Sequence, residues 1–189
     1  VKGKSIITGF PRTRASSAFV PEIMHSIFLG IGEQLMYYLF NKKGSWSLKK
    51  FIKNINSRLK GIRPPATFPR KPRSVLEHGI YKATEFYDFL IFYSIPILKN
   101  YFSHEYFQHW LSLIIPLHLL LQSSMDVEKD LPVAEYLLED FVKNFETFYD
   151  KSGLSYNMHQ ILHLPLYAAR FGLLWASTAF AFEHWNGMI

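Results

Sequence analysis

Residues 19–31 read FVPEIMHSIFLGI, and this stretch sets the expected fold. Its isoleucines recur every four residues and therefore share one face of a helix: Ile23, Ile27 and Ile31. Pro21 suits the first helical position, and Glu22 suits the first turn, where the helix dipole favours a negative charge. The pattern predicts a helix over residues 21–40.

Helical periodicity continues along most of the chain, and the further predicted helices cover residues 46–59, 82–93, 96–101, 104–121, 133–149 and 157–171. Ser45 is expected to cap the first of these, and Pro132 to lie in the first turn of the fifth. Residues 5–8 read as a short strand. Residues 61–73 form an irregular basic loop because four prolines interrupt them. We therefore expect a mainly α fold with little or no sheet.

The composition predicts one compact domain, because 189 residues with 49% hydrophobic and 17% aromatic content can bury a sizeable core. The absence of cysteine excludes disulfides and cysteine-ligated zinc, so any metal must bind histidine or carboxylate. Two prolines and several polar residues divide the apolar region 86–121 into pieces too short to span a membrane. The chain starts with Val1 rather than Met, and the last helix has no room to finish, so we expect a fragment of a longer polypeptide.

The charge of +6 and the pI near 9.4 favour an acidic partner such as nucleic acid or an anionic membrane face. Cations dominate residues 42–82 and acids dominate residues 126–150, so these zones should present faces of opposite sign. The basic helix and loop supply candidate contacts to a DNA backbone: Lys49, Lys50, Lys53, Arg58, Lys60, Arg63, Arg70, Lys71 and Arg73. The alternative is that these basic residues only form a solvent-exposed face and contact no DNA. No recognisable reading helix accompanies them, which argues against base-specific recognition.

Two acids are candidate chemical groups. Glu22 and His25 are three residues apart on one helical face, so the carboxylate could bind a metal that the imidazole helps to orient. The alternative is a helix-start glutamate beside a partly buried histidine. Glu183 lies in the apolar and aromatic stretch 177–187, where an ionised carboxylate needs a cation, a metal or hydrogen-bond donors. The alternative is that Glu183 lies on the solvent-exposed edge of a short C-terminal helix.

His159 and His163 are separated by four residues, a spacing that can chelate zinc. Gln160 stands where a metalloprotease would have glutamate, so the sequence favours hydrogen-bonded histidines in the core or a groove over metal ligands. Glycine-rich phosphate loops, serine-nucleophile elbows and cysteine nucleophiles are all absent from the sequence. The remaining choices are carboxylate and metal chemistry, or no chemistry.

Six motifs follow one another in the sequence, namely FVPEIMHSIFLG at 19–30, PRKPR at 69–73, YKATEF at 81–86, LSYNMHQILHL at 154–164, FGLLWAS at 171–177 and FAFEHWNG at 180–187. In this order they resemble the transposase core of CACTA (En/Spm-like) DNA transposons and of proteins derived from them. The resemblance covers nearly the whole chain. It implies a partial RNase H-like core with a large helical insertion in one compact unit: residues 1–44 and 156–189 would belong to the core, and residues 45–155 to the insertion.

Carried over position by position, the resemblance implies that Glu22 is the middle acid and Glu183 the last acid of a catalytic, metal-binding triad. It places four residues in supporting positions: His25, His159, His163 and Asn186. Two Mg²⁺ or Mn²⁺ ions would activate a water or 3′-hydroxyl and stabilise the leaving oxygen at a DNA phosphodiester. The family usually has aspartate at the Glu22 position, and its first aspartate lies upstream of the matched motifs. No acid precedes Glu22 here, so the fragment alone is not expected to cut DNA.

The resemblance therefore implies a fragment of a nuclear, transposase-like DNA-binding core, descended from a metal-dependent enzyme that cuts and joins DNA strands. The alternative is a catalytically inactive, domesticated helical module for DNA binding or protein interaction, in which Glu22 and Glu183 are structural. A third interpretation, a helical protein at a membrane surface, rests on the basic face and the apolar bulk. The DNA target, the activity of the full-length protein and homo-oligomer formation are left open.

Overall fold

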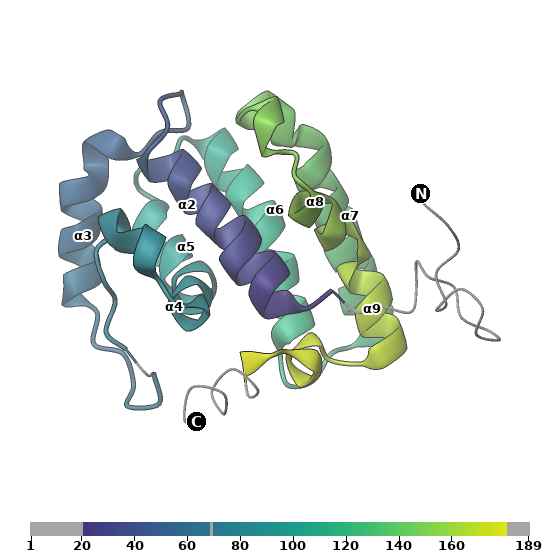
Figure 1. Cartoon of the computed structure of the whole chain (residues 1–189). Coiled ribbons are helices and arrows are strands. Elements are labelled where there is room, and N and C mark those ends of the chain that lie inside the picture. The colour runs from purple at the N-terminus through teal and green to yellow at the C-terminus, as the bar shows by residue number, and fades with distance from the viewer. Residues whose placement is uncertain (1–20, 69, 181–189) are drawn as a thin grey trace, which may run out of the picture.

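The computed structural model describes residues 21–68 and 70–180. These residues are mainly helical and include no strand, which confirms the expected mainly α fold for this part of the chain. Figure 1 shows the helices packed side by side around a shared interior. The strand predicted at residues 5–8 lies outside the described residues.

Segments labelled α are α-helical, and segments labelled η are π-helical or 3-10-helical. In chain order they are η2 (Met24–Gly32), α2 (Glu33–Phe40), η3 (Lys49–Phe51), α3 (Ile52–Gly61), η4 (Val75–Ile80), α4 (Ala83–Asp88), η5 (Phe89–Tyr93), α5 (Ser94–Leu98), α6 (His104–Leu121), α7 (Val127–Phe148), η6 (Lys151–Gly153), α8 (Tyr156–Gln160), η7 (Ile161–His163), α9 (Leu164–Phe171) and η8 (Leu174–Ser177).

The predicted first helix is present as η2 followed directly by α2, and it begins at Met24 rather than at residue 21. Its first nine residues are π-helical, which the 3.6-residue sequence pattern did not predict. The isoleucine face is fully buried. This helix crosses the molecule in Figure 1, with α4 and η4 packed on one side and α8 on the other. It therefore contacts elements from both halves of the chain.

Other predicted elements agree to different degrees. The predicted bounds of α6 match the structure, and the loop after α3 is irregular as expected. The second helix begins later than predicted, and the Ser45 hydroxyl is 2.6 Å from the Tyr106 hydroxyl instead of capping it. Helix α7 begins at Val127 because Asp126 accepts hydrogen bonds from the next turn, so Pro132 lies inside this helix and the predicted start is wrong.

The two longest described helices, α6 and α7, pack against each other along much of their length. Trp110 is fully buried in α6, and its indole N–H donates to the Ser94 hydroxyl, which donates in turn to the Leu90 carbonyl. This chain of hydrogen bonds satisfies polar groups inside an otherwise apolar interior. In the part of the chain that the structure describes, no helix is both long and apolar enough to cross a bilayer.

Candidate functional site

Glu22 lies two residues before η2, and its carboxylate has hydrogen-bond partners on both oxygens. Oε1 accepts from the backbone N–H groups of Met24 at 2.9 Å and Ala179 at 2.8 Å. Oε2 accepts from the backbone N–H of His25 at 2.9 Å and lies 2.6 Å from the Nδ1 atom of the same residue. The carboxylate thus caps the start of η2 and also holds a segment distant in the sequence.

The ionised form of Glu22 is favoured. Burial by itself would raise the pKa of the carboxyl, but the hydrogen bonds from Ala179, Met24 and His25 outweigh burial and lower the pKa. A carboxylate offers about four lone-pair positions, and two partners on each oxygen fill them. A metal ion would have to displace one of these partners.

The described residues do not by themselves fit the two-metal site that the resemblance implies. Across residues 21–68 and 70–180, no group of three or more His, Asp or Glu side chains is placed to hold an ion. His25 lies beside Glu22 as expected, but its imidazole is 57% exposed rather than partly buried. Glu183 and Asn186 lie outside the described residues.

The segment that precedes Glu183 is fixed to η2. Besides the contact from Ala179 to Glu22, the Phe180 ring stacks on the Phe28 ring with centroids 6.0 Å apart. Tyr87 of α4 meets both rings edge-on. The structure therefore brings residues 178–180 against the start of the first helix, which lies in the motif at residues 19–30.

The first motif also meets the motif at residues 154–164. Gly30 of η2 lies so close to the Asn157 side chain that a Cβ atom there would clash with the Asn157 amide, and the same Cβ would lie 3.0 Å from the His25 carbonyl oxygen. One turn later, Gln34 donates to the Gly153 carbonyl and accepts from the Ser155 hydroxyl. These contacts hold α8 against the first helix.

His159 and His163 lie on the outer side of this junction. Both histidines are exposed, so the core, one of the two placements expected for them, is wrong. Their Nε2 atoms are 3.2 Å apart, and each imidazole is the other's neighbour across one helical turn.

Arg73 and Glu85 join the motifs at residues 69–73 and 81–86. The guanidinium contacts both carboxylate oxygens, with Nε 2.6 Å from Oε1, and also donates to the Ile80 carbonyl. Burial would raise the pKa of Glu85, but the bonds from Arg73 and the Lys82 N–H lower it. Arg73, a candidate DNA contact, is thus committed to a structural ion pair.

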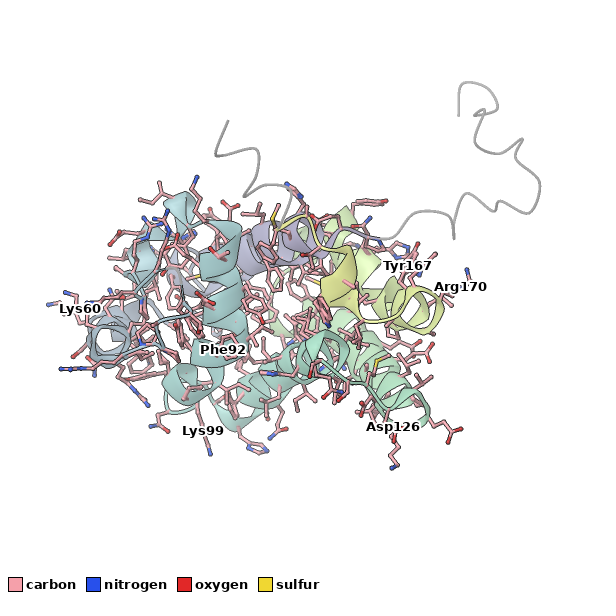
Figure 2. The ribbon with its side chains drawn as sticks, turned by 90° about the horizontal axis from the view of Figure 1, so that it is seen from below. Lys60, Phe92, Lys99, Asp126, Tyr167 and Arg170 are labelled. Carbon is pink, nitrogen blue, oxygen red and sulfur yellow. The ribbon has the colours of Figure 1, made fainter. Side chains whose placement is uncertain are left out.

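The candidate DNA contacts divide into two groups. Arg58 donates to the carbonyls of Pro96 and Ile97, and Lys49 donates to the Asn41 carbonyl. The Lys50 ammonium lies over the Phe51 ring, 4.8 Å from its centroid. The second group is exposed, and its side chains form no hydrogen bond or ion pair with any described residue: Lys53, Lys60, Arg63, Arg70 and Lys71. Figure 2 shows nitrogen-tipped side chains gathered around Lys60 at one end of the molecule, far from Asp126 at the other.

A cavity of about 350 Å³ lies beside Phe28. Its wall includes one acid, Asp88, that was not among the site residues predicted from the sequence. Aromatic side chains dominate the lining: Phe28, Phe68, Tyr87, Phe92, Trp175 and Phe180. Burial, and then the charge of Glu85, raises the pKa of Asp88 to about 6. The signal was an acid inside the apolar run 86–121, the same kind of signal that drew attention to Glu183.

Comparisons of this chain with protein-family models, with curated proteins and with solved structures found no match. The geometry of the described residues and the sequence motifs therefore carry the functional argument.

Proposed function

We propose that this chain is a transposase-derived helical core whose function is to bind DNA through the phosphate backbone. The observation that carries the proposal is a group of exposed cations on α3 and the following loop that form no hydrogen bond or ion pair with any described residue: Lys53, Lys60, Arg63, Arg70 and Lys71. A side chain already held by a carboxylate or a carbonyl contributes less to a new partner. Within the described residues, none of these five is held in this way.

An irregular loop next to a basic helix suits contact with phosphates along a duplex. Neutralising phosphates releases condensed counterions, so affinity should fall steeply as salt increases. Such contacts position a protein on DNA without reading its bases. The expected activity is therefore salt-dependent binding with little preference for sequence.

The descent from a transposase rests on the ordered motifs, and three contacts support it by joining motif to motif. Gly30 meets Asn157, Arg73 pairs with Glu85, and the Phe28 ring stacks on the Phe180 ring. Motifs that lie apart in the sequence thus meet in pairs in the fold.

A catalytic role for Glu22 and Glu183 is the second candidate. One observation favours it: Ala179, which contacts Glu22, is four residues before Glu183. Four residues of chain limit the distance between the Cα atoms of Ala179 and Glu183 to about 14 Å. The filled acceptor positions of Glu22 oppose a metal-ligand role for it in this arrangement. We therefore assign no catalytic step to it.

DNA binding is tested with two charge-reversal variants that change the net charge equally. Lys53→Glu with Lys60→Glu alters the exposed basic group, and Lys143→Glu with Lys151→Glu alters exposed lysines elsewhere. Fluorescence anisotropy with a duplex should be recorded between about 50 and 200 mM salt. The first variant should weaken binding and reduce the salt slope by about 2, whereas the second should retain the slope of the unchanged chain. Equal losses in both variants would refute a defined DNA-binding face.

Catalysis is tested separately by nicking of duplex DNA by the full-length protein with Mg²⁺ or Mn²⁺. Glu183→Gln should abolish nicking while leaving DNA binding intact if this acid is a ligand. Equal nicking by the unchanged protein and by Glu183→Gln would refute the catalytic role and leave the proposed DNA binding unaffected.

A further inference from the structure

The His159 and His163 imidazoles form a pair on the surface, and nothing in the proposed DNA-binding function requires this pair. His159 belongs to α8 and His163 to η7, one helical turn apart. Their ring centroids are 4.9 Å apart with an interplanar angle of 86°, and the two Nε2 atoms approach to 3.2 Å. The two atoms that face each other are both nitrogens, and each imidazole has one other nitrogen, Nδ1.

The distance between the nitrogens suits a shared ion. Zinc binds imidazole nitrogen at about 2.0–2.1 Å, so two ligands at a tetrahedral angle lie about 3.3 Å apart. The observed 3.2 Å is close to this value. Square-planar ligands at the same bond length would be about 2.9 Å apart, so the pair suits a tetrahedral ion better than square-planar copper.

The backbone that carries the pair is anchored before any ligand arrives. Met158, Ile161 and Leu164 are buried to 1% exposure or less and hold the same turns against the interior. The Ser155 hydroxyl accepts from the Met158 N–H and fixes the start of α8. The pair is thus held between buried anchors while both imidazoles face solvent.

We propose that His159 and His163 form an open two-histidine site for Zn²⁺. With both protons on Nδ1, both Nε2 atoms are free to bind one ion, and each imidazole binds as a neutral ligand. The described residues place no third His, Asp or Glu with this pair, so the remaining positions are filled by water or by another molecule. Imidazole ligands suit zinc rather than Mg²⁺, which separates this site from the metals implied by the resemblance.

The competing arrangement is a hydrogen bond in which one Nε2–H donates to the other Nε2. Both arrangements fit the distance, but only the zinc site predicts that an added ion binds at these two residues. Loss of either histidine should then weaken binding by about tenfold or more.

The test uses the full chain and zinc chloride in a buffer free of chelators, followed by calorimetry. The chain should bind one Zn²⁺, and His159→Gln and His163→Gln should each weaken this binding by about tenfold or more. His104→Gln changes an exposed histidine at the start of α6 and should leave it unchanged. Circular dichroism checks that each variant retains its helices, which is expected because both imidazoles are exposed.

Cobalt supplies a second readout that does not depend on a variant. Co²⁺ added to the unchanged chain should give the intense visible absorption of a tetrahedral site and should be displaced by Zn²⁺. Absence of zinc binding, or binding that survives in both His159→Gln and His163→Gln, would overturn the proposal and leave the hydrogen bond as the explanation of the pair.

Discussion

The Oε1 atom of Glu22 accepts a 2.8 Å hydrogen bond from the backbone N–H of Ala179, 157 residues further along the chain. The same carboxylate caps η2 through Met24 and His25. One side chain therefore starts the central helix and fixes the segment that leads toward Glu183. This dual role makes Glu22 important for stability whether or not DNA is cut.

Replacing Glu22 with glutamine should destabilise the fold. The new amide group has one oxygen, so at least one of the three backbone donors would face an NH₂ group instead of an acceptor. We expect a loss of about 1–2 kcal/mol in the free energy of unfolding, measured by urea denaturation near pH 7. Glu33→Gln changes an exposed acid in the adjoining helix α2 and should have little effect. Equal stability of the two variants would show that the cap contributes nothing.

The contribution of Glu22 should depend on pH. Its folded-state pKa is lowered, so the stabilisation is fully present above the unfolded pKa near 4.5 and is lost as the pH falls through the folded value. The unchanged chain and Glu22→Gln should therefore approach each other in stability as the solution is acidified. Parallel curves of stability against pH would contradict the lowered pKa.

Gly30→Ala tests the junction between the first helix and α8. Alanine normally stabilises a helix relative to glycine by about 0.5–1 kcal/mol. At Gly30, however, the Cβ atom would clash with the Asn157 side chain and lie 3.0 Å from the His25 carbonyl oxygen. We expect a destabilisation of about 1–3 kcal/mol, seen as a lower midpoint of thermal unfolding.

Gly61→Ala is the control for this substitution, because nothing lies within 4 Å of the added atom at the end of α3. It should be neutral or slightly stabilising. The same sign of change at both positions would mean that the close approach at Gly30 is not enforced in solution.

Local patterns in the sequence predicted the helices better than the site. The apolar period and flanking signals placed α6 within its observed bounds, and the four prolines placed the loop after α3. The start of α7 was missed because Asp126 was counted as part of an acidic zone rather than as a cap. Glu22 and His25 were predicted as neighbours from their spacing. The Glu22 bond to Ala179 and the Arg73 pair with Glu85 depend on tertiary packing, which no local pattern specifies.

Arg73→Lys should destabilise the fold although the charge is retained. Glu85 is only 6% exposed and receives two nitrogens of the guanidinium, which the single lysine nitrogen cannot reproduce. The third contact, to the Ile80 carbonyl, would also be lost. A decrease of about 1–3 kcal/mol in unfolding free energy is expected from urea denaturation. Lys71→Gln, at an exposed position two residues earlier, should leave stability unchanged and affect only DNA affinity.

Asp88→Asn should stabilise the fold near pH 7. The pKa of this buried acid is raised from 3.8 to about 6, because its charged form is desolvated and Glu85 lies nearby. A folded protein that holds the proton more tightly than the unfolded chain loses stability as the pH rises from about 4 to 6. Above this range the charged aspartate costs at most about 3 kcal/mol, which asparagine avoids.

Urea denaturation at about pH 4 and pH 7 separates this effect from simple repacking of the aromatic cavity. The variant should exceed the unchanged chain in stability at the higher pH and converge with it at the lower one. Glu135→Gln, an exposed substitution on α7, should show no such divergence. Burial raises the pKa of the Tyr87 and Tyr93 phenols, and the nearby Asp88 charge raises both further. A loss of stability at both pH values would instead indicate repacking of the cavity and would contradict the expected cost of the Asp88 charge.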